Sequence, residues 1–235
     1  MPKNKLKRFA DMVDYPNVIA PKFGEVFRTD FRLKGRWTHE VFGNDRPLVL
    51  ELGCGKGEYT VALARKHPEK NFIGVDIKGS RMWVGATDAL QHHLTNVVFL
   101  RTRIEFITSC FASGEVSEIW ITFPDPQPQE SRVNKRLTST RFLQSYSGIM
   151  QPEGVIHLKT DSRSLFEYTC QIAERNQLNV SVCTDDLYHS GYADDILSVQ
   201  TYYEKIFMDQ GFTIKYMKFS IPEDVTFVEL PKKDG

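Results

Sequence analysis

One stretch constrains the fold more than any other: an apolar run that stops at three closely spaced glycines. The run Leu48–Leu52 is aliphatic apart from one acid, and Gly53, Gly55 and Gly57 follow it at every second position. A helix-forming stretch begins directly after them. This order predicts a buried strand, a tight turn and the start of a helix. Glycine lets the chain bend sharply and lets a ligand approach the main chain, because it has no Cβ.

The spacing of the glycines separates this turn from two phosphate-binding loops. A dinucleotide-binding loop has the pattern G-x-G-x-x-G, which the turn lacks. A P-loop has Ser or Thr after its lysine, whereas Lys56 is followed by Gly57. Glu51, the acid near the end of the strand, would also repel a phosphate. The turn therefore favours a ligand that combines a nucleoside with a positive charge.

A second acid lies where a ribose would be held. Residues 71–77 predict the next strand, and Asp76 stands near its end, about twenty residues after the turn, where a carboxylate can bind both ribose hydroxyls. Glu51, the glycines and Asp76 together resemble the S-adenosylmethionine (SAM) site of Rossmann-like methyltransferases. The alternative, an ordinary glycine-rich turn, is less favoured because it leaves the placement of Asp76 unexplained.

Strand and helix patterns alternate along most of the chain. We expect further strands at residues 97–100, 118–123, 155–159, 178–183 and 212–219, and helices at residues 58–66, 80–93, 106–111, 138–150 and 162–175. This alternation predicts an α/β, Rossmann-like fold with a mostly parallel sheet, an antiparallel edge and helices on both faces. With 235 residues, 41% of them hydrophobic, the chain can form one such domain. We assign it to residues 47–235, after a basic N-terminal arm and lead-in segment, residues 1–46.

Composition narrows the class of protein. Lys and Arg number 30, as do Asp and Glu, so the net charge neither requires nor excludes a nucleic acid. In residues 1–46, aromatic residues are interleaved with cations, a pattern that suits RNA binding through phosphate contacts and stacking. For residues 1–8 alone, the alternative is a solvated, disordered tail. Four dispersed cysteines and six scattered histidines predict reduced, buried thiols and no metal. The chain shows no signal-peptide pattern and no membrane-length apolar run, so we expect a cytoplasmic protein.

The tips of the predicted strands carry acids. Ligands of parallel sheets bind beyond the carboxyl ends of the strands, so we expect Glu51, Asp76, Asp125 and Asp161 to meet around one cleft. Asp125 lies in the sequence F-P-D-P-Q-P-Q, residues 123–129, whose three alternate prolines stiffen the segment and remove main-chain donors. A basic loop follows, where an RNA backbone would pass. Asp161 also has a simpler explanation, as an acid at a helix N-terminus.

These motifs together resemble the bacterial tRNA (guanine-N7-)-methyltransferases over nearly the whole chain. The resemblance rests on E-L-G-C-G-K-G, F-P-D-P, N-K-R-L-T, Thr160-Asp161 and T-Y-Y-E at residues 201–204. It implies SAM as cofactor, tRNA as partner, and methyl transfer to N7 of a guanosine, at position 46 of the variable loop. It places SAM-binding positions at Glu51, Asp76, Arg103 and Asp125, beside the turn glycines Gly53, Gly55 and Gly57. It places substrate-binding positions at Asp161 and at residues 201–204, of which we favour Thr201 and Glu204 as the polar contacts.

Two positions depart from the family pattern. Arg103 replaces an acid or Asn that can accept from the adenine amino group; backbone carbonyls or Glu105 can accept there instead. Gln127 and Gln129 replace Trp and a cation. Gln129 can still hydrogen-bond the substrate, and the positive charge can come from Arg132, Lys135 or Arg136, which follow it.

The residue set suits the chemistry. Guanine N7 already has an exposed lone pair, so methyl transfer needs placement and not prior removal of a proton. We expect Asp125 to be catalytic, because a fixed carboxylate can stabilise the cationic purine and accept from its Watson–Crick edge; Asp161 can do the same. Two alternatives stay open: a methyltransferase for another base or a protein amino group, and a non-catalytic RNA-binding protein. A monomer and a homodimer both fit the sequence.

Overall fold

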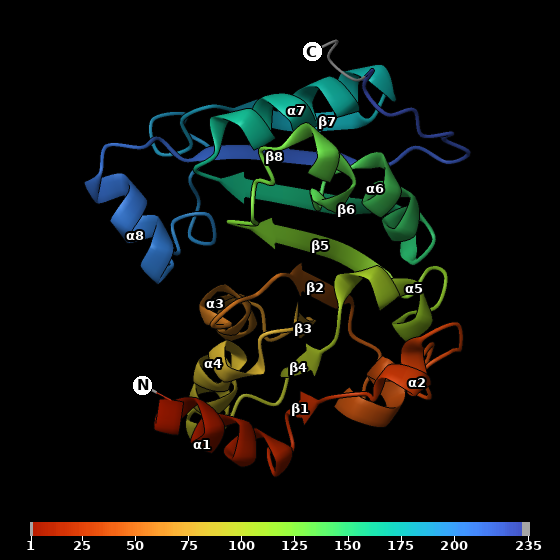
Figure 1. Cartoon of the computed structure of the whole chain (residues 1–235), viewed down its shortest axis with the longest axis vertical. Helices are drawn as coiled ribbons and strands as arrows, with labels where there is room; N and C mark the ends of the chain where they lie inside the picture. Colours follow the sequence, from red (N-terminus) through yellow and green to blue (C-terminus); the bar gives the residue numbers. More distant parts are fainter. Residues whose placement is uncertain (1, 232–235) are drawn as a thin grey trace.

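The computed structural model describes residues 2–231, and one eight-stranded sheet forms its centre (Figure 1). The strand order is β1-β4-β3-β2-β5-β6-β8-β7. Neighbours from β1 to β6 run parallel, and β8 pairs antiparallel with both β6 and β7. The predicted mostly parallel sheet with an antiparallel edge is confirmed. The strands are β1 (Val18–Ile19), β2 (Leu48–Leu52), β3 (Asn71–Asp76), β4 (Val97–Arg101), β5 (Val116–Thr122), β6 (Met150–Thr160), β7 (Asn179–Thr184) and β8 (Lys215–Ser220).

Helices cover both faces of the sheet, and the sequence of β2 suits burial on both sides. Leu48, Leu50 and Leu52 pack into one core and Val49 into the other, because successive side chains of a strand point to opposite faces. A strand buried on both faces therefore reads as a continuous apolar run. The first core includes residues of α5 (Ile107–Cys110), α6 (Thr140–Ser147) and α7 (Arg163–Arg175); the second includes residues of α1 (Pro2–Val13), α3 (Glu58–Lys66) and α4 (Gly79–Gln91).

The strand order changes direction at β2, with β3 on one side and β5 on the other. Leu52 lies opposite Val75 of β3, and Thr122 of β5 lies opposite Lys159 of β6. The tips of β3, β2, β5 and β6 therefore share one edge. A crevice opens at such a switch point, beyond the carboxyl ends of the strands.

Residues 1–46, which we expected to form a basic lead-in arm, are joined to the rest of the chain at several points of their described part. Helix α1 lies along α4, where Trp83 Nε1 donates to the carboxylate of Asp11 over 3.1 Å. Strand β1 extends the sheet beside β4. Short helix α2 (Phe23–Val26) and π-helix η1 (Trp37–Phe42) follow, and Trp37 is fully buried with its Nε1 donating to Cys110 O over 2.8 Å. Aromatic residues of this segment therefore contribute to the core.

The cysteines only partly match the expectation of buried thiols. Cys54 and Cys110 are buried, but Cys170 of α7 is half-buried and Cys183 of β7 is exposed. The sulfur atoms of Cys170 and Cys183 lie 3.6 Å apart. Linear spacing did not reveal this pair, because α7 and β7 bring the two residues together in space.

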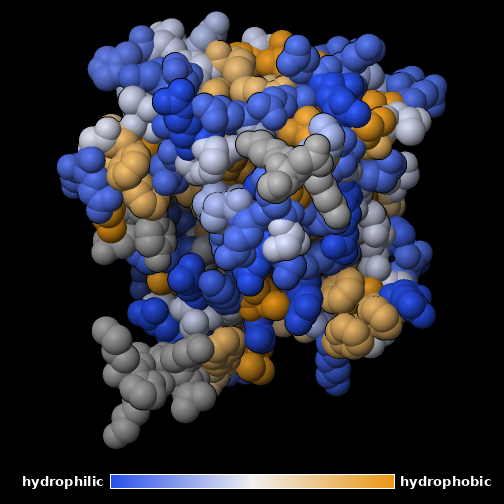
Figure 2. All heavy atoms as spheres, turned by 45° about the horizontal axis from the view of Figure 1, so that its top comes forward, coloured by the Kyte–Doolittle hydropathy of each residue, from blue (hydrophilic) through white to orange (hydrophobic). Residues whose placement is uncertain are grey.

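Hydrophilic residues cover most of the face shown in Figure 2, and apolar residues form small separate groups on it. Within residues 2–231, no helix has both the length and the apolar character that a membrane span requires. Within the same residues, no cluster of three or more His, Cys, Asp or Glu side chains is arranged to hold a metal ion.

Candidate active site

Two adjoining cavities open at the carboxyl edge of the sheet. The first has a volume of about 310 Å³ and lies between the glycine turn, the tips of β3 and β5, and Thr201. The second has a volume of about 300 Å³ and extends to residues 102–105, which follow β4. Gly53, Asp76, Lys135 and Leu137 line both. The two cavities therefore form one groove, with Asp76 where they meet.

The three glycines of the turn have two different roles. All three have left-handed backbones, with φ of +77° at Gly53, +56° at Gly55 and +74° at Gly57. Gly53 and Gly55 line the first cavity, as we expected. Gly57 does not: a Cβ there would lie 2.5 Å from the ring of Phe99. Gly57 therefore lets α3 pack closely on β4, while the other two glycines leave space for a ligand.

Glu51 lies at the floor of the first cavity and is only 2% exposed. Its carboxylate accepts hydrogen bonds from the hydroxyls of Thr60 in α3 and Thr122 at the end of β5. Burial raises its pKa from an ordinary 4.5 to about 7, although the hydroxyl groups oppose the shift. A cationic group in the cavity would favour the ionised form of this carboxyl group. Glu51 is thus suited to hold a ligand ammonium.

Asp76 is held in place by the main chain. One carboxylate oxygen accepts from the N–H of Gly55 over 2.9 Å, and the other accepts from the N–H of Lys78 over 2.7 Å. Each carboxylate oxygen has two lone pairs, so each can still accept from a ligand hydroxyl. The pair of hydroxyls on a ribose matches this arrangement.

Asp125 lies in a constrained loop after β5 and lines the first cavity with Glu51 and Asp76. Phe123 and Gln127, on either side of it, have φ of +48° and +44°. Such backbones are uncommon for residues other than glycine and cluster at functional sites. The Asp125 carboxylate accepts from the N–H of Gln127 over 3.1 Å, and Arg136 Nε donates to the Gln127 carbonyl over 3.1 Å. The loop therefore presents Asp125 at a defined place.

One cation of the loop after Asp125 reaches the groove. Lys135 is exposed and lines both cavities. Arg136 is buried, with its guanidinium 4.4 Å from the ring centre of Tyr168. Arg132 is exposed but lines neither cavity. Of the three cations that we considered for the missing charge at Gln129, Lys135 is therefore the one beside the groove.

Known proteins resemble this chain in sequence over most of its length. A family model described as "Putative methyltransferase" matches residues 45–217. A tRNA (guanine-N(7)-)-methyltransferase from Bacteroides thetaiotaomicron is 57% identical over 95% of this chain and 88% of its own length. One of the same name from Christiangramia forsetii is 49% identical over 93% of this chain and 98% of its own. This chain belongs to the tRNA (guanine-N(7)-)-methyltransferase family. The resemblance found in its motifs is confirmed.

Solved structures support the fold of this family member. The 16S rRNA methyltransferase KamB matches with a TM-score of 0.60 and 16% identity, over 78% of this chain and 92% of KamB. A 16S rRNA (adenine(1408)-N(1))-methyltransferase variant from Catenulisporales acidiphilia, solved with the cosubstrate SAM, matches with a TM-score of 0.56 and 13% identity, over 83% and 92% of the two chains. At these identities the likeness concerns the fold alone, and it confirms the Rossmann-like prediction.

The remaining predicted residues divide into two groups. Thr201 lines the first cavity, and Arg103 lines the second together with Glu105. Outside both cavities lie Gln129, Arg132, Asp161 and Glu204. Asp161 is half-buried two residues before α7, and burial raises its pKa.

Glu204 is fully buried in an ion pair with Lys159 and does not reach the groove. Sequence reasoning missed this pair, as it missed Thr60 and Thr122 beside Glu51. One signal was available for Glu204: T-Y-Y-E at residues 201–204 has the form of a capping box, in which the acid binds the main chain of its own helix.

Proposed function

We propose that this chain transfers the methyl group of SAM to N7 of a guanosine in tRNA, in the cytoplasm where that tRNA is found. One observation carries the proposal: Glu51, Asp76 and Asp125 line one cavity beside Gly53 and Gly55, in a chain 57% identical to a tRNA (guanine-N(7)-)-methyltransferase. All of these groups come from one chain, so the proposal holds equally for a monomer and for a homodimer.

The groove fits the parts of SAM in order. Asp76, at the junction of the cavities, suits the ribose hydroxyls. Glu51 suits the ammonium of the methionine part, since a positive neighbour would relieve its unfavourable ionisation. The second cavity takes the adenine, where Glu105 can accept from the amino group and Arg103 can donate to a ring nitrogen. SAM supplies a methyl group on a positively charged sulfur, and its methionine part in the first cavity would bring that group towards Asp125.

The protein then has to place the base. Guanine N7 attacks with its own lone pair, so placement supplies much of the catalysis. We assign Asp125 to the guanine, where it accepts from N1–H and the amino group and stabilises the positive charge that the purine acquires. The Thr201 hydroxyl can donate to the same base, because its hydrogen is not used when its oxygen accepts from the Glu204 N–H.

The rest of the tRNA needs contacts outside the groove. Lys135 at the groove suits a phosphate next to the extruded guanosine. We assign Gln129, Arg132 and Asp161, which follow the ends of β5 and β6, to the nucleotides around it. Because each phosphate contact releases counterions, tRNA affinity should fall steeply with added salt even though the net charge of the chain is zero.

The test is a label-transfer assay. The chain is incubated with SAM labelled in the methyl group and with unmodified tRNA, and the tRNA is then digested to nucleosides and separated. The proposal predicts label in 7-methylguanosine, and none when guanosine 46 of the tRNA is replaced by adenosine. Label in another nucleoside or in protein would instead support a methyltransferase for another base or a protein amino group. RNA binding without SAM binding or label would support a non-catalytic RNA-binding protein.

A further inference from the structure

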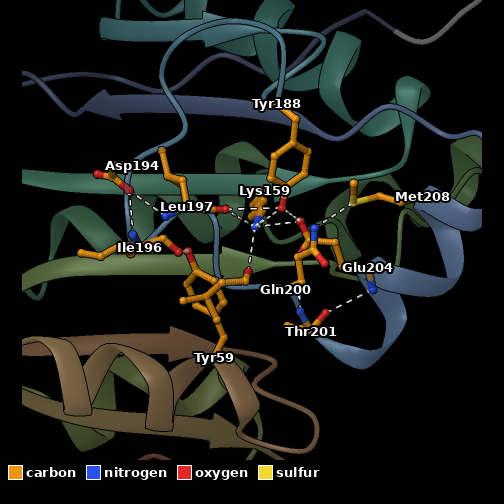
Figure 3. Close-up of polar contacts among 11 residues, drawn as sticks. Tyr59, Lys159, Tyr188, Asp194, Ile196, Leu197, Gln200, Thr201, Glu204 and Met208 are labelled. Atoms are coloured by element: carbon orange, nitrogen blue, oxygen red, sulfur yellow. Dashed lines mark hydrogen bonds and ion pairs between the residues drawn. The ribbon is translucent and has the colours of Figure 1, made fainter.

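A buried ion pair lies beside the first cavity (Figure 3). Lys159, next to last in β6, and Glu204, in α8 (Tyr202–Asp209), bring Nζ and Oε1 to 2.8 Å, and both side chains are 0% exposed. Removing two charges from water costs free energy that their attraction offsets only in part. Stability alone is therefore a weak reason for such a pair, and its contacts indicate another role.

Lys159 supports a segment that has little regular structure of its own. This segment, residues 185–201, joins β7 to α8, and we call it the strap. Besides Glu204, Lys159 Nζ donates to the carbonyls of Leu197 over 2.7 Å and Val199 over 3.1 Å. An ammonium group has three hydrogens, and these three partners are its shorter contacts, with the Tyr188 hydroxyl farther away at 3.4 Å. Carbonyls outside helices and sheets need other donors when buried, and Lys159 supplies two of them.

Further contacts hold the strap against the cavity wall. The Tyr188 hydroxyl donates to Glu204 Oε1, and the Tyr59 hydroxyl donates to the Ile196 carbonyl over 3.1 Å. Tyr59 itself lines the first cavity. The strap also has internal support: Asp194 accepts from two strap N–H groups, and Leu187 is fully buried.

Glu204 connects Lys159 directly to the cavity. Its Oε1 binds the Lys159 ammonium, and its Oε2 accepts from the N–H of Thr201 over 3.3 Å. The Glu204 N–H in turn donates to the Thr201 hydroxyl oxygen over 3.2 Å. Thr201 ends the strap, begins α8 and lines the first cavity. A single carboxylate therefore transmits the position of Lys159 to Thr201.

Lys159 is also tied to the loop that carries Asp125. The Lys159 carbonyl accepts from the N–H of Phe123 over 2.8 Å, at the point where β5 ends. The Phe123 ring packs on Phe207 of α8, with 6.4 Å between the ring centres. The Asp125 loop and the strap thus meet at one residue of β6.

We propose that Lys159 is a positioning residue for methyl transfer: through Glu204 and the strap it fixes Thr201 relative to Asp125. Glu204 then acts through Thr201 and not by contact with tRNA. The inference rests on the proposed function for its effect on turnover, but the ordering of the strap is independent of any reaction. The SAM-binding groups Asp76 and Arg103 make none of these contacts.

The test compares Lys159→Met with the wild type in three measurements. Hydrogen exchange should become about tenfold faster or more in peptides covering residues 194–209, because the strap loses its donors. The turnover number with tRNA should fall about 100-fold, as expected when reacting groups are misplaced. The dissociation constant for S-adenosylhomocysteine should change by less than about threefold.

Lys70→Met is the matched control. Lys70 also pairs with a glutamate, Glu118, with 2.7 Å between Nζ and Oε2, but it stands just before β3, at the opposite edge of the sheet. This variant should keep wild-type turnover and wild-type exchange in the strap.

A double variant, Lys159→Met with Glu204→Leu, covers the case in which the single variant does not fold. It leaves no unpaired buried charge, so it should be at least as stable as Lys159→Met. Its strap still lacks the donors, so its turnover should remain low. Wild-type turnover in the double variant, or wild-type exchange in the strap of Lys159→Met, would overturn the proposal. If the wild type fails to methylate tRNA, the proposed function fails, and the exchange measurement still decides whether Lys159 orders the strap.

Discussion

Replacing Glu51 by Gln should make the free protein more stable near neutral pH and, at the same time, weaken its binding of SAM. Glutamine has the shape of glutamate, and the two threonine hydroxyls that donate to Glu51, those of Thr60 and Thr122, can both bond to it: one donates to the amide oxygen and the other turns to accept from the amide NH2. The variant therefore removes one buried ionisation and little else. A gain in stability coupled to a loss of binding is the behaviour of a residue retained for its function.

The size of the gain follows from the pKa of Glu51. Burial raises this pKa from 4.5 to about 7. Below about pH 4.5 the group is protonated in both the folded and the unfolded state, and there is no cost. Between pH 4.5 and 7 the unfolded chain loses the proton and the folded chain keeps it, so the free energy of unfolding falls as the pH rises. At about 1.4 kcal/mol for each pKa unit, the full cost above pH 7 is about 3 kcal/mol.

Urea unfolding of both proteins between pH 5 and pH 8 measures this directly. The free energy of unfolding of Glu51→Gln should exceed that of the wild type by less than about 1 kcal/mol at pH 5 and by about 3 kcal/mol at pH 8. Calorimetric titration with SAM at pH 8 should show affinity reduced by about tenfold to 100-fold, the loss of one hydrogen bond to a charged group.

Glu118→Gln is a control with the opposite sign. Burial alone would raise the pKa of Glu118, but hydrogen bonds and charges from His157 and Lys70 hold it at about 2. Because its ionised form is stabilised by folding, this variant should lose stability at pH 8. A Glu51→Gln variant that is less stable than the wild type at pH 8, or that shows the same difference at every pH, would refute the reasoning.

Four further predictions follow from the site and the fold. Asp125→Ala should lower turnover by about 100-fold or more with stability changed by less than about 1 kcal/mol; near-normal turnover would remove its catalytic role. Gly57→Ala should lower the free energy of unfolding by about 2 to 4 kcal/mol in urea, because its φ is +74° and its Cβ would meet the Phe99 ring; an unchanged midpoint would contradict this. Lys135→Ala should reduce the slope of log Kd for tRNA against log salt by about one, and an unchanged slope would argue against a phosphate contact. A mild peroxide should join Cys170 and Cys183 in a disulfide, seen as the loss of two hydrogen atoms by mass spectrometry and abolished by Cys183→Ser.

The parts of the fold with strong local patterns could be predicted from the sequence. The apolar run of β2, the glycines and the start of α3 are fixed by neighbouring residues, and the predicted helix at residues 58–66 matches α3. Asp76 and Asp125 could be placed together because the tips of parallel strands must share an edge. The same rule also predicted Asp161 beside them, which is wrong because Asp161 lines neither cavity, and it did not predict Glu58, which lines the first.

Features that depend on long-range contacts could not be predicted. Strand β1 has two residues, and only its pairing with β4 makes it a strand. Gly57 looks like its neighbours in the sequence, and only the position of Phe99 shows that it serves packing. Lys159 and Glu204 belong to elements separated by α7, β7 and the strap, and the local sequence of neither residue indicates a buried partner.

The central claim is that the groove at the tips of β2, β3 and β5 holds the methyl donor. A crystal structure of the chain with S-adenosylhomocysteine tests this most directly. We predict the ribose hydroxyls on Asp76, the ammonium at Glu51, the adenine beside Arg103 and Glu105, and the sulfur directed towards Asp125. A ligand bound elsewhere, or bound with its sulfur directed away from Asp125, would contradict the claim.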